Sequence, residues 1–126
     1  MKLPAADLLA AEPFCRLTTT GRVTGRPRTI EIWFALHRTT VYFLSGGGDR
    51  ANWVRNLLRD PAAQVRIAGE TFAGSGRVVT DAAEAGVARR LLLAKYGPGY
   101  GGDLSGWGRT ALPVAVDLEV AAGRRS

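Results

Sequence analysis

The first half of the chain is organised as short runs that favour β-strands. Residues 14–20 are mostly β-formers, and the run 29–36 begins with alternating polar and apolar positions before becoming continuously apolar. A third apolar run covers 41–44. Turn-forming residues lie between these runs, with glycines in the first connection and a tight link at 37–39. This pattern predicts three consecutive antiparallel strands.

A short amphipathic helix is expected next. Asp49 is a suitable N-cap, Trp53, Leu57 and Leu58 recur at helical spacing, and Asp60-Pro61 ends the pattern. The apolar positions predict one buried helix face.

The rest of the chain predicts a hairpin, a helix and a closing strand. Segments 64–67 and 74–79 have strand character and are joined around Gly69-Glu70, while the glycines of the second segment suggest a bulge. Thr80 or Asp81 caps a helix that runs to about Tyr96 and buries Val87, Leu91 and Leu92. A loop with six glycines then covers 97–108, and strand character returns at 112–120.

The order of these elements predicts a mainly β (α+β) protein. Six strands with helical crossovers fit a small, mostly antiparallel β-barrel with two or three helices at its rims, which leaves few exposed edges. We expect a single domain over 13–121, an N-terminal arm with a short helix over 1–12, and a tail over 122–126.

Charge adds a preference for anionic ligands. The 126 residues include 17 basic and 11 acidic side chains, for a formal charge of +6, and most of the basic ones are arginine. Arginine favours bidentate contacts with phosphate or carboxylate. Nucleic acid is a weaker alternative, because the aromatic residues lie inside apolar runs instead of alternating with basic ones.

Cysteine and histidine are too few for a conventional metal site. Cys15 is the only cysteine and His37 the only histidine, so neither a disulfide within the chain nor a set of nitrogen and sulfur ligands is expected. The strand position of Cys15 favours a small buried thiol over a nucleophile. Without a signal segment or an apolar run of membrane-spanning length, we expect a cytoplasmic protein with no stable membrane insertion.

The segment 17–28 carries the strongest candidate chemistry. Arg22, Arg26 and Arg28 surround a turn between Gly21 and Gly25, with no acid nearby. Glycine lets backbone amides approach a ligand closely, and the arginines add permanent positive charge. The pattern therefore predicts a phosphate or other anion site, while a solvated turn with no ligand stays an equal alternative.

A second candidate loop runs from Ser45 through Gly46 and Gly47 into the predicted helix. Backbone amides and a helix N-terminus favour anions, although Asp49 would repel a phosphate placed directly at the cap. Asn56 is a poor residue for the middle of a helix unless its amide has a partner. An exposed amide that contacts only water would explain Asn56 equally well.

Two tyrosines in or beside the glycine loop are candidates for substrate alignment or proton donation. Tyr96 and Tyr100 could stack on a planar ligand, or they could simply anchor the loop. The chain offers no Ser-His-Asp set and no close carboxylate pair, so the reactive group of an enzyme built on this sequence would belong to a bound cofactor.

Three segments together resemble the deazaflavin-dependent nitroreductase and quinone reductase family. They are LTTTGRVTGRPRTIEIWF, VYFLSGGGDRANWVRNLLRDPAAQVRI and WGRTALPVAV, in this order, and the resemblance covers about 14–120. It implies a split β-barrel that binds the 8-hydroxy-5-deazaflavin coenzyme F420 and passes a hydride to a quinone, a nitro-compound or another electron-poor acceptor.

The resemblance also implies roles for particular residues. Contacts to the phosphate and polyglutamate tail fall on the arginine turn, with Thr24 and Pro27 shaping it, while Ser45 lies beside the ring or the substrate. Tyr96 and Tyr100 match tyrosines of the substrate pocket. The residues implied in coenzyme binding are Arg22, Thr24, Arg26, Pro27, Arg28, Trp33, Ser45, Gly46, Gly47, Trp53 and Asn56.

Other interpretations stay open at this point. FMN could use the same arginine turn in the same kind of barrel, and a non-catalytic deazaflavin carrier would need no acceptor site. The family often has a lysine after the serine and a longer loop, where this chain has Gly46-Gly47-Gly48. The expected partners are a small-molecule redox acceptor and no nucleic acid, with the chain acting as a monomer or homodimer.

Overall fold

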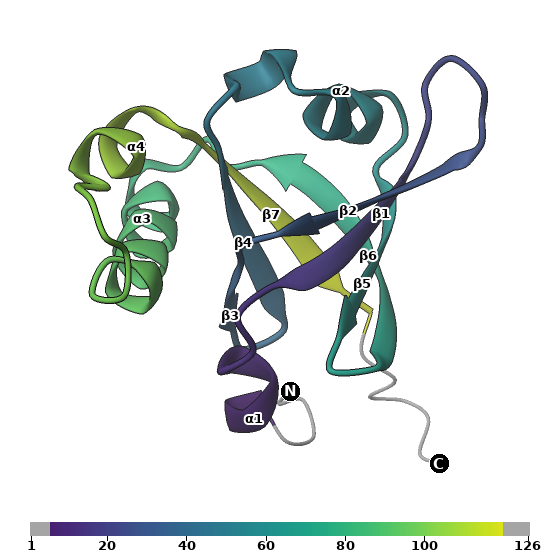
Figure 1. Cartoon of the computed structure of the whole chain (residues 1–126). Coiled ribbons are helices and arrows are strands. Elements are labelled where there is room, and N and C mark those ends of the chain that lie inside the picture. Colours follow the sequence, from purple (N-terminus) through teal and green to yellow (C-terminus); the bar gives the residue numbers. More distant parts are fainter. Residues whose placement is uncertain (1–5, 120–126) are drawn as a thin grey trace.

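A computed structural model describes residues 6–119, which build a seven-stranded antiparallel sheet curled into a half-barrel (Figure 1). The strand order is β2-β1-β5-β6-β7-β4-β3, so β2 and β3 form the two edges. The strands are β1 (Cys15–Thr20), β2 (Pro27–Ile32), β3 (Ala35–His37), β4 (Thr40–Ser45), β5 (Ala62–Ile67), β6 (Glu70–Val78) and β7 (Leu112–Leu118). The helices are α1 (Ala6–Ala10), the 3₁₀ turn η1 (Gly48–Arg50), α2 (Asn52–Arg59), α3 (Ala82–Tyr96) and α4 (Ser105–Thr110).

Two hydrophobic clusters lie on opposite faces of the sheet. The inner cluster fills the half-barrel and is covered at one end by α2 (Figure 1). The outer cluster packs α3 against β4 and β7. β4 is buried on both faces, since Val41 and Phe43 join the inner cluster while Tyr42 and Leu44 join the outer one. Its continuous apolar run is the pattern expected of such a strand.

The mixed α+β half-barrel confirms the predicted fold class. The predicted strand 29–36, however, is two strands, because β2 ends at Ile32 and β3 begins at Ala35. β2 pairs with β1, whereas β3 pairs with β4. Side chains of α3 hold the backbone of Phe34 at the break, where Tyr96 and Lys95 make the hydrogen bonds that a neighbouring strand would otherwise make.

The short helices differ from the predicted pattern. Asp49 lies in η1 and does not cap α2, whose N-cap is Ala51 without a side-chain bond, so that prediction is wrong. Leu58 was predicted to be buried, but it is 60% exposed at the end of α2. Helix α4 interrupts the predicted glycine loop. Just before this helix, the Asp103 carboxylate accepts the Ser105 N–H at 2.9 Å.

Two further predictions concern the start of α3 and the N-terminal helix. Asp81 is the N-cap of α3 and accepts the Glu84 N–H at 2.8 Å, as predicted. In α1, Leu9 is buried in the inner cluster, while the first residues of the predicted arm and the tail 122–126 lie outside the described residues. Within 6–119, no helix combines the length and apolarity needed to cross a bilayer.

The strand glycines serve close packing, and the predicted bulge is absent between Gly74 and Gly76. Pairing with β7 continues in register through both residues. A Cβ at Gly74 would lie 2.7 Å from Val116 Cγ1 and 2.8 Å from the Asp117 carbonyl oxygen. Gly74 therefore lets β7 approach closely, and Gly76 does the same for α2.

Gly74→Ala is expected to lower the free energy of unfolding by about 1–2 kcal/mol, because the new methyl group meets a backbone oxygen that cannot move aside. The matched control is Gly86→Ala in α3, where a Cβ has open space and which should stabilise the helix by about 0.5–1 kcal/mol. Urea unfolding of both variants measures the difference. Equal midpoints would show that β6 and β7 accommodate the methyl group.

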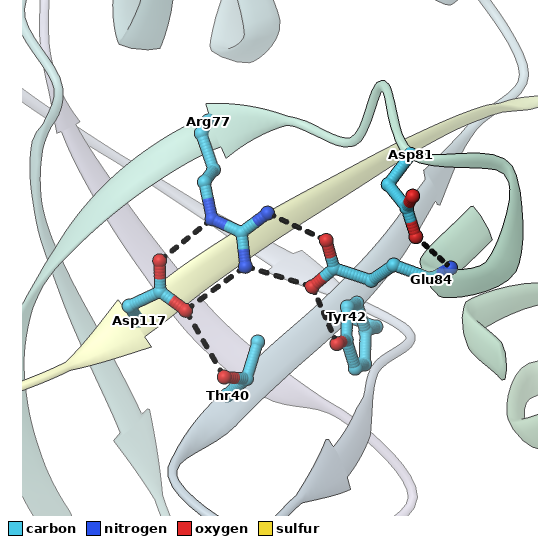
Figure 2. A network of polar contacts seen from close by, with 6 residues as sticks. All are labelled: Thr40, Tyr42, Arg77, Asp81, Glu84 and Asp117. Carbon is cyan, nitrogen blue, oxygen red and sulfur yellow. Dashed lines mark hydrogen bonds and ion pairs between the residues drawn. The ribbon is translucent and has the colours of Figure 1, made fainter.

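A polar network joins three strands to α3 (Figure 2). Arg77 on β6 binds Glu84 on α3 through two nitrogens, at 2.8 and 2.7 Å, and also binds Asp117 on β7 at 2.7 Å. Tyr42 donates to Glu84 at 2.7 Å, and Thr40 donates to Asp117 at 3.0 Å. The network therefore fixes the start of α3 to the sheet.

This network predicts a loss of stability in acid. Hydrogen bonds from Arg77 and then Tyr42 lower the pKa of Glu84 to about 2, and Arg77 also lowers the pKa of Asp117. Because both carboxyl groups have a lower pKa in the folded protein, their contribution is complete above about pH 5 and is lost towards about pH 2.

We expect the network to contribute about 1 kcal/mol, since its ion pairs are partly exposed. Arg77→Gln should make the decline of unfolding free energy between about pH 5 and pH 2.5 shallower. Urea unfolding at each pH measures this slope. Parallel curves for the variant and the wild type would contradict the assignment.

Candidate active site

The arginine turn is a closed loop between β1 and β2. The Gly21 N–H donates to the Arg26 carbonyl and the Gly25 N–H to the Gly21 carbonyl, both at 2.8 Å. Gly25 has a φ of +73°, a conformation that favours glycine. Thr24 Oγ1 accepts the Arg26 N–H at 3.2 Å, so Thr24 does shape the turn. The backbone is thus fixed independently of any ligand.

Arg22 is held against α2 by two asparagines. Asn56 Oδ1 accepts from the Arg22 backbone N–H at 3.2 Å and from Nη1 at 2.9 Å, while Asn52 Oδ1 accepts from Nη2 at 3.1 Å. Asn56 is 4% exposed, and its Nδ2 donates to Thr19 Oγ1 at 3.2 Å. Asn56 therefore has the partners that its mid-helix position required.

These residues line a cavity of about 570 Å³ between the turn, β2 and α2, which we call the arginine cavity. Arg22 and Arg28 contribute positive charge, and none of the acidic side chains between residues 6 and 119 lines the cavity. The ion pairs found within residues 6–119 involve Arg16 and Arg77 and none of the turn arginines. The lining is Thr19, Gly21, Arg22, Val23, Thr24, Pro27, Arg28, Thr29, Ile30, Asn52, Trp53 and Asn56.

The arginine cavity brings together six of the predicted coenzyme-binding residues, namely Arg22, Thr24, Pro27, Arg28, Trp53 and Asn56. Arg26 is in the same turn but does not line the cavity. Thr19 and Asn52 were not foreseen. The spacing of Asn52 and Asn56, four residues apart on one helix face, is a signal that would have paired them.

A second hollow of about 640 Å³ lies beside the next residues of β2, and we call it the aromatic hollow. Trp33 packs parallel to Tyr96 with ring centroids 4.3 Å apart. Tyr100 and Trp107 stand nearly perpendicular to Trp33, at 6.0 and 5.7 Å. The lining is Phe14, Glu31, Ile32, Trp33, Tyr100, Asp103, Leu104 and Trp107.

Helix α4 holds one wall of this hollow. Arg89 on α3 donates through Nη1 to the carbonyl oxygens of Gly108 and Ala111, at 2.7 and 2.9 Å. A Cβ at Gly108 would lie 2.5 Å from Leu93, so the glycine permits close packing of α4 on α3. These contacts fix Trp107.

The hydroxyl of Tyr96 is engaged with the backbone. It accepts the Phe34 N–H at 3.0 Å and donates to the Pro13 carbonyl at 2.8 Å. Burial raises the pKa of Tyr96 to about 12. The neighbouring Lys95 donates to the Phe34 carbonyl at 3.0 Å, and burial lowers its pKa to about 8. The ring of Tyr96 therefore stacks on Trp33, while its hydroxyl hydrogen is already used in the hydrogen bond to Pro13.

Cys15 is buried in β1, as predicted for a small structural thiol. Burial raises its pKa to about 12, which keeps the thiol protonated. It lines neither of the two hollows described above.

The serine and glycine loop lines neither hollow. Ser45 is 3% exposed at the end of β4, and its hydroxyl donates to the Gly48 carbonyl at 2.8 Å. Gly47 precedes η1. Gly46 lies against Trp107, where a Cβ would be 3.7 Å from Cδ1 of the indole. The loop therefore supports the aromatic wall, and the structure does not bring Ser45 to either hollow.

Comparison with protein families settles the relationship. The model of the F420H2-dependent quinone reductase family matches residues 4–119. The chain belongs to this family. It is therefore an oxidoreductase with F420H2-dependent reductase activity, and its coenzyme is F420.

Several solved structures share the fold of this F420H2-dependent reductase at low sequence identity. An F420-H2 dependent reductase shares 20% identity with a TM-score of 0.66, covering 85% of this chain and 94% of its own. A 5-nitroimidazole antibiotic resistance protein of Bacteroides thetaiotaomicron shares 14%, with a TM-score of 0.69 over 90% of this chain and 78% of its own. A conserved hypothetical protein of Mycobacterium tuberculosis shares 15%, with a TM-score of 0.72 over 94% and 82%.

The donor set of the arginine cavity fits coenzyme F420. Two guanidinium groups and the Thr24 and Thr29 hydroxyls line a space free of acidic side chains, which suits phosphate and carboxylate groups. Gly21 permits the tight closure of the turn, because a Cβ there would lie 3.1 Å from the Arg26 carbonyl oxygen and 3.2 Å from Thr24 Oγ1.

Proposed function

We propose that this reductase binds the anionic part of coenzyme F420 in the arginine cavity and a flat, electron-poor acceptor in the aromatic hollow. A quinone or a nitro-compound is the acceptor class. The observation that carries the proposal is the placement of the two hollows along one edge strand, since Ile30 lines the first and Glu31 lines the second.

The residues of the arginine cavity would act by position and charge. Arg22 is fixed by Asn52 and Asn56 before a ligand arrives, so little side-chain entropy is lost when it contacts a phosphate. Arg28 adds a second guanidinium, and Trp53 offers an aromatic surface at the α2 side. Arg26, outside the lining, would contribute long-range charge only.

The aromatic hollow would orient the acceptor and exclude water. The reduced coenzyme, when bound, supplies a hydride. Trp33 and Trp107 offer flat surfaces for stacking, and Tyr100, which is 48% exposed, has a hydroxyl that can donate a proton to a reduced acceptor. Tyr96 and Ser45 would position the site through their backbone hydrogen bonds.

Mixing the protein with F420H2 and a panel of acceptors tests the proposal. The panel contains a water-soluble naphthoquinone and a nitroimidazole, and the recovery of F420 fluorescence on oxidation is followed. We expect protein-dependent recovery with at least one acceptor. Binding of F420H2 without recovery would favour a carrier, and activity with FMN in place of F420 would favour the flavin alternative.

A further inference from the structure

The two hollows differ in the sign of their charge. Among the residues that the structure describes, no basic side chain lines the aromatic hollow, but Glu31 and Asp103 do. The arginine cavity has the opposite composition. This contrast stands out in a chain with a formal net charge of +6, because a random surface of this protein would more often be basic.

Three aromatic rings in different planes line the hollow. Tyr100 and Trp107 pack nearly perpendicular to Trp33, at 86° and 88°. Aromatic rings attract organic cations, because the face of such a ring carries partial negative charge.

Three positive side chains, Arg16, Lys95 and Arg109, lie near the hollow but are not among its lining residues. Arg109 lies close enough to Asp103 to act on it electrostatically. Lys95 lies 5.2 Å from the centre of the Tyr96 ring, but its ammonium donates to the Phe34 carbonyl and it does not line the hollow. Arg16 pairs with Glu31 at 3.0 Å in an exposed contact. Exposed ion pairs of this kind contribute little to stability, so the carboxylate of Glu31 can still interact with a second partner.

We propose that the aromatic hollow selects flat acceptors that carry a positive charge, such as N-alkylated aromatic nitrogen heterocycles. This inference rests on the proposed function and names the substrate class of its acceptor site. A cationic acceptor that takes a hydride gains one C–H or N–H bond and becomes neutral. A C–H bond of the reduced coenzyme breaks in this step, and the oxidised coenzyme releases one proton to solvent. No separate proton donor is needed.

The change of charge would also favour turnover. The cation is held by the rings and by the carboxylates of Glu31 and Asp103, whereas the neutral product keeps only the stacking contacts. The hollow would therefore bind the substrate more tightly than the product. A neutral quinone lacks this difference.

Equilibrium dialysis of the protein without coenzyme tests the binding preference. The probes are N-methylphenazinium and phenazine, which share one tricyclic ring system and differ in charge. We expect the cation to bind about tenfold more tightly at low salt and to lose much of this advantage between about 20 mM and 300 mM NaCl. Equal affinities at low salt would overturn the proposal.

Four variants locate the effect. Glu31→Gln and Asp103→Asn should each weaken binding of the cation about threefold and leave phenazine unchanged. Arg16→Ala should tighten binding of the cation, because it removes a competing charge from Glu31. Glu70→Gln is the matched control, since Glu70 is an exposed carboxylate at the β5–β6 hairpin. Equal losses in Glu70→Gln and the two hollow variants would place the binding elsewhere.

The test separates the two proposals. If the cation binds preferentially but no acceptor restores F420 fluorescence, the charge preference of the hollow stands, while its role as an acceptor site and the proposed function fail. If quinones are reduced while N-methylphenazinium and phenazine bind equally, the proposed function stands and the inference fails. Reduction of N-methylphenazinium with a higher kcat/KM than phenazine, reversed in Glu31→Gln, supports both.

Discussion

Replacing Arg28 with alanine is expected to weaken the binding of coenzyme F420 by about 10- to 100-fold, the effect of losing about 1.5–3 kcal/mol from a hydrogen bond to a charged group. Arg28 lines the arginine cavity and belongs to none of the ion pairs found within residues 6–119. Its loss therefore removes a ligand contact without breaking a contact of the fold. Fluorescence titration with F420 measures the dissociation constant.

Two controls distinguish a direct contact from a general effect of charge. Arg26→Ala removes the same charge from the same turn but outside the cavity lining, and should weaken binding by no more than about threefold. Arg66→Ala removes an exposed arginine on β5 and should have no effect. If all three variants bind F420 as the wild type does, the coenzyme does not use the arginine cavity. If all three lose affinity equally, the attraction is long-range.

Replacing Asn56 with alanine is expected to lower the free energy of unfolding by about 2–3 kcal/mol. The buried amide connects three groups, namely the Thr19 hydroxyl and the backbone and guanidinium of Arg22. Thr19 is 3% exposed, so it would lose a partner that water cannot easily replace. F420 binding should weaken as well, because Arg22 would lose part of its anchor.

Asn52→Ala is the matched control for this prediction. Asn52 is exposed and accepts one hydrogen bond from the same guanidinium, so its loss should cost about 0.5 kcal/mol or less. Urea unfolding of both variants gives the comparison, and F420 titration gives the effect on binding. Similar unfolding free energies for Asn56→Ala and the wild type would contradict the role of the buried amide.

The fold was predictable where local patterns dominate. Alternation and turn residues located β1, β4 and the β5–β6 hairpin, and Asp81 located the start of α3. The break between β2 and β3 was not predictable, because it depends on Tyr96 and Lys95, which come some sixty residues later. The local sequence around Phe34 predicts one continuous strand.

The candidate site was predictable in part for the same reason. The arginines and glycines of the turn are neighbours in the sequence, so their grouping was evident. The role of Asn56 was suspected from its poor fit to a helix interior, but its partner Thr19 belongs to another strand. The internal hydrogen bond of Ser45 depends on how the chain turns at Gly48, which sequence spacing does not reveal.

The hydrogen bonds to Phe34 have a consequence for how such proteins diversify. Lys95 and Tyr96 secure the edge of the half-barrel from the last turn of α3, just before the glycine-rich stretch begins. Insertions and substitutions between Gly97 and the start of α4 can therefore accumulate without loosening the sheet. Related proteins with this fold could acquire new acceptor preferences through sequence changes in this stretch, while the coenzyme site stays the same.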